Sequence, residues 1–310
     1  MTDSLIAIVL GVVEGMTEFL PVSSTGHLLI AEHFIPRQSD LFNVVIQAGA
    51  VLAVIPLFHH RFHQFLFRWR DPAVRDYLLK IIVACAITGG PGYIMKKKGL
   101  ALPESLLPVA IALLIGGALF IIVEGWLAKR GREPGARVTW SIAVAVGIGQ
   151  LIAAVFPGSS RSGTTILFSL MLGLSRPLAT EFSFLVSIPT MLAASGLMLF
   201  KAVHETGAAA ENWSMVWIAS IVAAVVSFIV VKWFLRYVQT HTFVAFGWYR
   251  IVLAALILAG LFTGYLAEKK PEPEPAHAAA AAMTVVALDL GASHLCRISN
   301  DQFAMTNFQS

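Results

Sequence analysis

The sequence predicts an all-α integral membrane protein with about six transmembrane helices and two re-entrant helix pairs in an inverted-topology repeat. Three observations carry this prediction: the composition, the number of long apolar segments, and a pair of similar polar breaks. Hydrophobic residues make up 57% of the 310 residues and charged residues only 13%, against about 25% charged in an ordinary soluble domain. The mean hydropathy of +0.77 argues against a soluble fold. The net charge of +4 does not indicate nucleic-acid binding, because the basic residues cluster between apolar segments.

Six segments have the length of roughly 20 apolar residues that is needed to cross a bilayer core of about 30 Å. They cover about residues 41–58, 77–95, 106–128, 179–202, 214–237 and 244–266. We therefore expect a single membrane-embedded domain over residues 1–266. Residues 267–310 change in character to a charged, proline-rich and alanine-rich stretch without spanning length. We expect this tail to be disordered or non-native.

Two further apolar regions are interrupted by polar turns. Leu5–Leu20 would form a helix of roughly 24 Å that stops at Pro21, and Leu28–Ile35 follows it. Residues 139–156 and 164–174 repeat this arrangement around Pro157. Each region is typical of a helix–turn–helix pair that enters and leaves the bilayer on the same side.

The two interrupted regions belong to an internal repeat, with copies at about 1–95 and 138–237. A shift of 136 residues places Gly11, Glu14, Pro21, Ser23 and Ser24 on Gly147, Gln150, Pro157, Ser159 and Ser160. Three spans lie between the copies, so the second copy enters from the opposite face. Inverted repeats with broken helices place their site where the two breaks meet.

Basic residues near the ends of the spans predict the orientation in the membrane. Cytoplasmic loops are enriched in Lys and Arg. Such residues follow the first, third and fifth spans: Arg61, Arg68, Arg70, Arg75, Lys129, Arg130, Arg132, Arg137 and Arg236. We expect these loops in the cytoplasm and the N-terminal turn on the outer side.

The most informative polar residues in the first break are two glutamates. Glu14, Thr17 and Glu18 share one helix face, and the glutamates are about 6 Å apart along the axis. Carboxylates this close repel each other unless a cation or a proton lies between them. The chain then continues into Ser23, Ser24, Thr25 and His27, which offer hydroxyl groups and an imidazole that titrates near neutral pH.

The second break carries the features of an anion site. Ser159, Ser160 and Ser162 surround Arg161, with Thr165 one turn further on. Backbone N–H groups at the start of a helix bind anions, and a guanidinium is the side chain best shaped to bind phosphate. An isolated charge at mid-bilayer costs about 2.5–3.5 kcal/mol. We therefore expect the two glutamates and Arg161 to be paired, metal-bound or exposed in one polar cleft, where the glutamates would complement a divalent cation.

The two motifs resemble those of the BacA/UppP family of undecaprenyl-diphosphate phosphatases. Residues Gly11–His27 match GxxEGxTEFLPxSSTGH and residues 157–165 match PGxSRSxxT, and the resemblance covers nearly all of residues 1–266. It implies a bacterial inner-membrane enzyme, with its cleft toward the periplasm, that hydrolyses undecaprenyl diphosphate to undecaprenyl phosphate. The product is the recycled lipid carrier of peptidoglycan synthesis, and family members confer bacitracin resistance.

The resemblance also implies the site residues. It places the acidic motif on Glu14 and Glu18, and the phosphate contacts on Ser23, Ser24, Thr25, His27, Ser160, Arg161, Ser162 and Thr165. Among these we expect catalytic roles for Glu14, Glu18, Ser24, His27 and Arg161. Glu14 and Glu18 would bind the cofactor, a divalent cation given as magnesium or calcium. The nucleophile stays open between a serine and a water activated by His27 or a glutamate. The expected partners are undecaprenyl diphosphate and the lipid bilayer, with a homodimer left open.

Two polar residues outside the motifs have two interpretations in the sequence. Gln47 and Glu181 fit groups behind the site or interhelical hydrogen-bonding residues equally well. Tyr249 and Arg250 are typical of anchors at the membrane interface.

The alternative function is a polyprenyl-phosphate flippase, because inverted repeats with an anion site also describe transporters. Adjacent carboxylates favour hydrolysis, since moving an anion gains nothing from them.

Overall fold

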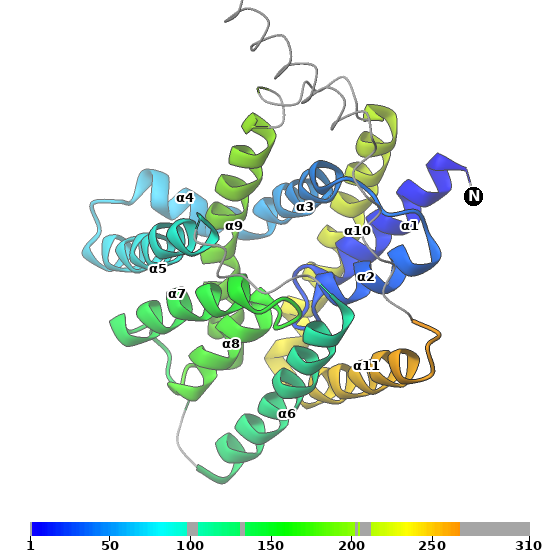
Figure 1. Ribbon diagram of the computed structural model, residues 1–310. Helices are drawn as coiled ribbons and strands as arrows, with labels where there is room; N and C mark the ends of the chain where they lie inside the picture. The colour runs from blue at the N-terminus through cyan, green and yellow to red at the C-terminus, as the bar shows by residue number, and fades with distance from the viewer. Residues whose placement is uncertain (1, 98–104, 131–133, 202–203, 205–211, 267–310) are drawn as a thin grey trace, which may run out of the picture. The chain divides into compact units, whose positions relative to one another are not determined.

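The computed structural model describes residues 2–97, 105–130, 134–201, 204 and 212–266, and the tail at 267–310 lies outside these residues. The described part is helical, with turns and one isolated bridge between Gly135 and Leu174 (Figure 1). Its longer helices are α5 (Pro72–Lys97), α6 (Leu106–Arg130), α9 (Arg176–Lys201), α10 (Trp213–Thr240) and α11 (Val244–Phe262), and α3 (Asp40–Val54) is extended by the helices that follow it. The all-α membrane fold is confirmed.

Five of the expected spans are long and apolar enough to cross a membrane. They are α6, α9, α10, α11 and the continuous stretch Asp40–Phe67, in which α3 is followed by a short 3₁₀ helix, η1 (Ile55–Phe58), and by α4 (His59–Phe67). The sixth, expected at 77–95, lies within α5, which has 26 residues but is less apolar than the other five. The reason is local: its first turns carry Arg75, Asp76 and Lys80, and Pro91 lies inside the helix.

Each polar break forms a pair of short helices. The first pair is α1 (Asp3–Thr17) and α2 (Ser24–Phe34), and the second is α7 (Trp140–Val155) and α8 (Arg161–Met171). With 11 to 16 residues, these helices are about 16–24 Å long and too short to cross the bilayer core. In each pair the proline that follows the first helix, Pro21 or Pro157, disfavours continuation of that helix.

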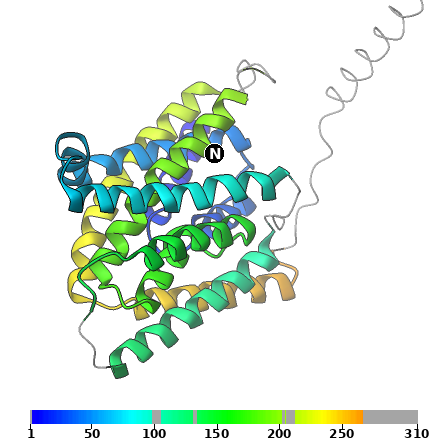
Figure 2. The ribbon, with the colours of Figure 1, turned by 90° about the vertical axis from the view of Figure 1, so that its left-hand side faces the viewer.

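Each pair packs mainly against a long helix from the other half of the chain. Helix α1 lies along α10, and α7 lies along α5 (Figure 2). Glycines at equivalent positions allow both contacts. A Cβ on Gly11 would lie 2.6 Å from the carbonyl oxygen of Ala219, and one on Gly147 would lie 3.0 Å from that of Ala84. Two further contacts connect the long helices: α3 of the first half contacts α9 of the second half, and α6 contacts α11. The two halves therefore pack against each other along several helices.

Ion pairs and hydrogen bonds show which helix ends lie together. Arg61 of α4 donates to Glu181 of α9 at 2.7 Å. Glu124 of α6 accepts from Arg176 at the start of α9 and, at 2.9 Å, from the backbone N–H of Phe243 just before α11. The starts of α4, α9 and α11 therefore share one end of the helical domain with the end of α6.

The re-entrant pairs start from opposite ends of this domain. At the start of α1, Asp3 accepts a hydrogen bond from Asn212 at 3.2 Å, which places it beside the start of α10. At the start of α7, Trp140 lies against Lys80 in the first half of α5. Helix α5 begins just after the basic α4–α5 connection, so α7 starts at the end that carries the basic residues.

Candidate active site

The two polar turns have the same backbone conformation. Ser23 and Ser160 are the non-glycine residues with positive φ in the described part of the chain, at 73° and 67°. Each is the N-cap of the next helix, and its side chain accepts from a glycine N–H three residues on, Gly26 at 3.4 Å and Gly163 at 3.2 Å. The structural match of the turns is thus Ser23 with Ser160, one residue later than the shift of 136 predicts.

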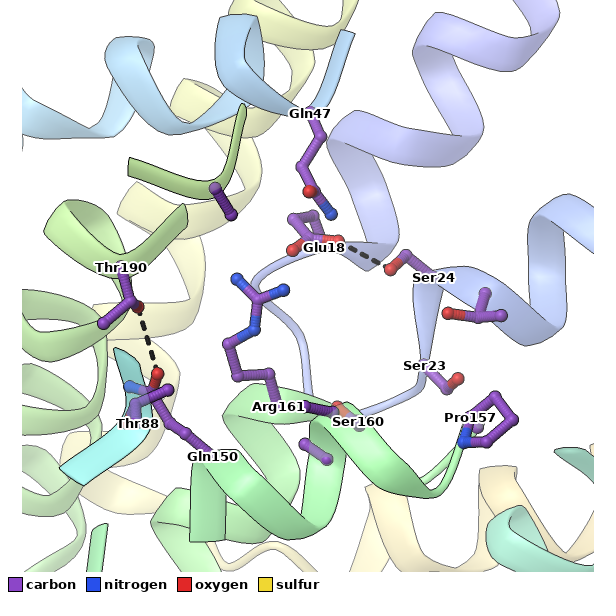
Figure 3. Close-up of a pocket in the computed structure, with 15 residues that line it drawn as sticks. Glu18, Ser23, Ser24, Gln47, Thr88, Gln150, Pro157, Ser160, Arg161 and Thr190 are labelled. Carbon is purple, nitrogen blue, oxygen red and sulfur yellow. Dashed lines mark hydrogen bonds between the residues drawn. The ribbon is translucent and has the colours of Figure 1, made fainter. Parts of the chain in front are cut away.

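A cavity of about 380 Å³ lies between the two turns. Residues of both turns line it, together with residues of α3, α5, α7 and α9, so both halves of the chain contribute to its wall (Figure 3). The residues lining it are Glu18, Ser23, Ser24, Thr25, Gln47, Thr88, Gln150, Ala153, Ala154, Pro157, Gly158, Ser160, Arg161, Thr190 and Ala194. Six of the ten sequence-predicted site residues are among them, and most of the other polar groups are hydroxyls or amides.

The first turn contributes the acidic side of the cavity. The Ser24 hydroxyl donates to Glu18 Oε2 at 2.6 Å, so the carboxylate and the hydroxyl are in direct contact. Glu14 is 1% exposed and does not line the cavity. Its Oε2 is buried without a hydrogen-bond partner, and its side chain is close enough to interact electrostatically with Glu18 and Arg161. The expected acid pair is therefore present, with Glu18 at the cavity wall and Glu14 behind it.

The second turn contributes the positive charge. Arg161 is the first residue of α8, and its side chain points toward Glu18 in Figure 3. Among the described residues, no acid lies within 4.0 Å of its guanidinium to form an ion pair. A guanidinium has five N–H donors, so this one offers donors to the cavity.

Four predicted site residues do not line the cavity. Besides Glu14, these are His27, Ser162 and Thr165. The ring of His27 is held at both nitrogens, with Nδ1 2.7 Å from the carbonyl oxygen of Ser23 and Nε2 2.6 Å from the hydroxyl of Tyr249. Ser162 donates to the carbonyl oxygen of Leu20 at 3.1 Å, which ties the second turn to the first.

Thr165 is fully buried and hydrogen-bonds to the Ser183 hydroxyl of α9 and to carbonyl oxygens within α8. These contacts fix α8 against α9. In this structure Thr165 therefore holds the second turn from behind, where a phosphate in the cavity would not touch it.

Sequence reasoning missed several polar residues of the cavity wall. It leaves Gln47 open and does not single out Thr88, Gln150 or Thr190 as site residues. Thr190 Oγ1 donates to Gln150 Oε1 at 3.0 Å. The one available signal is that Gln150 aligns with Glu14 in the repeat. The threonines lie in apolar helices, where a Thr hydroxyl commonly bonds its own backbone, as Thr88 does to Ala84.

Arg250 hydrogen-bonds to the backbone of both turns and is not an anchor at the membrane interface. It is fully buried in α11, and its guanidinium donates to the carbonyl oxygens of Pro21 at 3.4 Å, Gly158 at 3.3 Å and Ser159 at 3.0 Å. Gly163 leaves room for it, since a Cβ there would lie 2.8 Å from Nη1. The neighbouring Tyr249 is 46% exposed, but its hydroxyl contacts His27.

A second cavity, of about 520 Å³, lies at the end with the basic residues and includes Arg61 and Glu181. Glu181 accepts from Arg61 and, at 3.4 Å, from the Tyr77 hydroxyl. These charges neutralise each other, and neither residue lines the cavity between the turns. Of the two interpretations of Glu181, the structure favours an interhelical contact.

Comparison with known proteins adds to this geometry. A family model described as bacitracin resistance protein BacA matches residues 7–256. An undecaprenyl-diphosphatase of Rhizobium etli is 50% identical over 266 residues, which cover 86% of this chain and 100% of the relative. An undecaprenyl-diphosphatase of Xanthomonas euvesicatoria pv. vesicatoria is 47% identical over 262 residues, covering 84% of this chain and 98% of the relative. The chain therefore belongs to the bacitracin resistance protein BacA family.

Proposed function

We propose that this protein hydrolyses the terminal phosphate of undecaprenyl diphosphate, giving undecaprenyl phosphate and inorganic phosphate. This activity would recycle the lipid carrier of cell-wall synthesis and confer resistance to bacitracin. Relatives that match nearly their full length are named for this activity. The observation that carries the proposal is the cavity itself, in which the guanidinium of Arg161 and the carboxylate of Glu18 face one space between two helix starts.

The cavity has the donors that a diphosphate needs. Arg161 can bind two oxygens of one phosphate at once, and charge develops on those oxygens as the phosphoryl group is transferred. Ser23, Thr25 and Ser160 add hydroxyl groups or helix-start backbone to the same wall. We assign these residues to phosphate binding. Ser162 and Thr165 instead hold the second turn in place, through Leu20 and Ser183.

Glu14 and Glu18 fit a divalent cation such as magnesium or calcium. Glu14 Oε2 is buried without a donor, which is costly unless something neutralises it. No group of three His, Cys, Asp or Glu side chains suited to a metal occurs in the described ranges. Two carboxylates completed by substrate phosphate oxygens match the usual environment of magnesium. The cation would supply positive charge to the phosphate oxygens, and Glu14 and Glu18 would hold it.

The contact between Ser24 and Glu18 supports a route to the product. In this route Ser24 Oγ attacks the terminal phosphorus, its proton passes to Glu18, and the bond from phosphorus to the bridging oxygen breaks. Undecaprenyl phosphate leaves, and water then hydrolyses the phosphoserine. The 2.6 Å hydrogen bond from Ser24 to Oε2 supports Glu18 as the base, and its other oxygen, Oε1, would hold the cation. His27 does not line the cavity and has both ring nitrogens engaged, so we assign it to holding the Ser23 carbonyl.

The placement of the cavity supports an active site on the outer side of the bacterial inner membrane. Gln47 lies seven residues from the start of α3, and Ala194 lies seven residues before the end of α9, which is about 10 Å in each case. These are the helix ends opposite to the one that carries Arg61 and Arg236. Since basic ends favour the cytoplasm, the cavity lies nearer the outer face.

Release of inorganic phosphate from a polyprenyl diphosphate by the purified protein in detergent tests the proposal. We expect activity that a chelator abolishes and added magnesium restores. Arg161→Lys should lower kcat/KM by about 100-fold or more, because a lysine cannot make the bidentate contact, and Glu18→Gln should do the same. Arg137→Lys, at an exposed site in the connection before α7, is the matched control and should retain full activity.

Two results would count against the proposal. If the wild-type protein released no phosphate yet moved labelled polyprenyl phosphate across liposomes, the flippase would replace the phosphatase. If acid quenching during turnover trapped no phosphoserine while a burst of undecaprenyl phosphate was seen, water would replace Ser24 as the nucleophile.

A further inference from the structure

We propose that Gln150 is a substrate-binding residue that contacts the diphosphate, and that it is the neutral counterpart of Glu14 in the second half of the chain. The proposal rests on the function proposed above and extends its site beyond the two sequence motifs. It assigns different roles to the two halves of the cavity: the first half provides the acid groups, and the second provides donors for the diphosphate, the charged Arg161 and the neutral amide of Gln150.

The position of Gln150 is the first observation. It lies in α7, five residues before the end of that helix at Val155, and is 2% exposed. It lines the same cavity as Glu18 and Arg161. In the view of Figure 3 the guanidinium of Arg161 lies between Glu18 on one side and the pair formed by Gln150 and Thr190 on the other.

The hydrogen bonding of the amide is the second observation. Thr190 Oγ1 donates to Gln150 Oε1 at 3.0 Å, which leaves the NH₂ group as the free end of the side chain. Gln150 Nε2 is buried and has no hydrogen-bond partner. A buried donor without an acceptor is costly, and a bond to a charged acceptor is among the strongest such groups make. A phosphate oxygen in the cavity is an acceptor of this kind.

The repeat explains why the group is neutral. Gly11 and Gly147 pack equivalently against α10 and α5, so Glu14 and Gln150, three residues further on, hold equivalent places in α1 and α7. A glutamate at both places would put a third carboxylate around an anionic head group, where like charges repel. The amide keeps the size of the side chain and offers a donor in place of that repulsion.

Three variants test the proposal through binding as well as turnover. The probe is farnesyl methylenediphosphonate, which has the diphosphate shape and cannot be hydrolysed. We expect Gln150→Ala to weaken its binding about 10-fold, because one bond to a charged group is lost. Gln150→Glu should weaken it more, because it adds repulsion. Thr190→Val should also weaken binding of the probe, but less, because it removes only the hydrogen bond that Thr190 donates to the Gln150 amide.

The turnover measurements separate binding from chemistry. We expect Gln150→Glu to raise KM for farnesyl diphosphate more than 10-fold and to change kcat less than about threefold, because a binding contact acts on ground state and transition state alike. Gln239→Glu is the matched control: it makes the same change at an exposed position at the other end of the domain and should leave both constants unchanged. Unchanged thermal unfolding of Gln150→Glu would confirm that its fold is intact.

Each outcome supports or overturns the assignment. If Gln150→Ala and Gln150→Glu bind the probe as tightly as the wild-type protein does, the assignment is wrong. If kcat falls while binding is kept, Gln150 acts on the reaction and our division of roles fails. A wild-type protein that binds the probe but releases no phosphate would overturn the proposed function alone, because the binding comparison at Gln150 still stands.

Discussion

Ser23 and Ser160 show at the residue scale how the site is built. Both have positive φ, at 73° and 67°, a conformation that costs a non-glycine residue about 1–3 kcal/mol. Each side chain caps the helix that follows it. The cap and the surrounding contacts hold both turns in this conformation, which directs Ser24 and Arg161, the first residues of α2 and α8, into one cavity.

Substitutions at Ser160 measure this backbone strain. We predict that Ser160→Ala lowers the free energy of unfolding more than Ser160→Gly does, because alanine loses the cap and keeps the strain, whereas glycine tolerates positive φ. Ser39 is the matched control, since it also caps a helix but has φ of −66°. The Ala–Gly difference should be wider at Ser160 than at Ser39 by about 1 kcal/mol. Equal differences in thermal unfolding would contradict the account.

At the element scale, close helix contacts place the re-entrant pairs. Helices α1 and α7 approach α10 and α5 at glycines, so their backbones determine the depth of each turn in the domain. Helix α11 then ties the turns together through Arg250, which donates to backbone carbonyls of both. The geometry of the cavity thus depends on helices that contribute no residue to either motif.

Alanine at Gly11 or Gly147 should disturb this packing. A Cβ on Gly11 would lie 2.6 Å from the Ala219 carbonyl oxygen, and one on Gly147 would lie 2.9 Å from Ile87 Cβ. We predict that each variant loses about 1–3 kcal/mol of stability through overpacking and also loses phosphate release. Gly125→Ala in α6 is the control, because apart from the backbone of its own helix and its chain neighbours no atom lies within 4 Å of its new methyl group. Gly125→Ala should keep or raise stability, because alanine favours a helix more than glycine does. A loss at Gly125 equal to that at Gly11 would show that close packing at Gly11 is not the cause.

Replacing Arg250 should loosen both turns at once. Arg250→Met leaves the carbonyls of Pro21, Gly158 and Ser159 without this donor, at a cost of about 1–3 kcal/mol for each buried group left unsatisfied. We predict a lower unfolding temperature and little phosphate release, with partial recovery of both in Arg250→Lys. Arg137→Met, at an exposed position, should change neither. Full activity in Arg250→Met would mean that the turns are held without it.

The elements differ in how well the sequence predicts them. The short helices of the breaks follow from apolar runs that end at Pro21 and Pro157, and the acidic and arginine motifs follow from charge in an apolar setting. Helix α5 is harder to classify, because Arg75, Asp76 and Lys80 lower its hydropathy. Arg250 could not be assigned, since its partners are backbone carbonyls, which leave no pattern in the sequence.

At the scale of the whole molecule, the repeat and the inverted arrangement together explain the site. The first helix pair starts with α1 beside the start of α10 at one end of the domain, and the second starts with α7 beside α5 at the other end. The polar turns of the two pairs lie further inside the domain. They meet at a cavity that neither half encloses alone. The sequence predicts this meeting because the two halves share a pattern. It does not predict Thr88 or Thr190, because their role depends on which helix faces fold together.

A double-mutant cycle on phosphate release tests most directly the claim that both halves act on one head group. The measured quantity is kcat/KM for wild-type protein, Arg161→Lys, Glu18→Gln and the double variant, each checked for folding by thermal unfolding. Residues that act on the same substrate group are not additive. We predict that the double variant loses hardly more activity than the more damaging single change. Losses that multiply would show two independent sites and contradict the account.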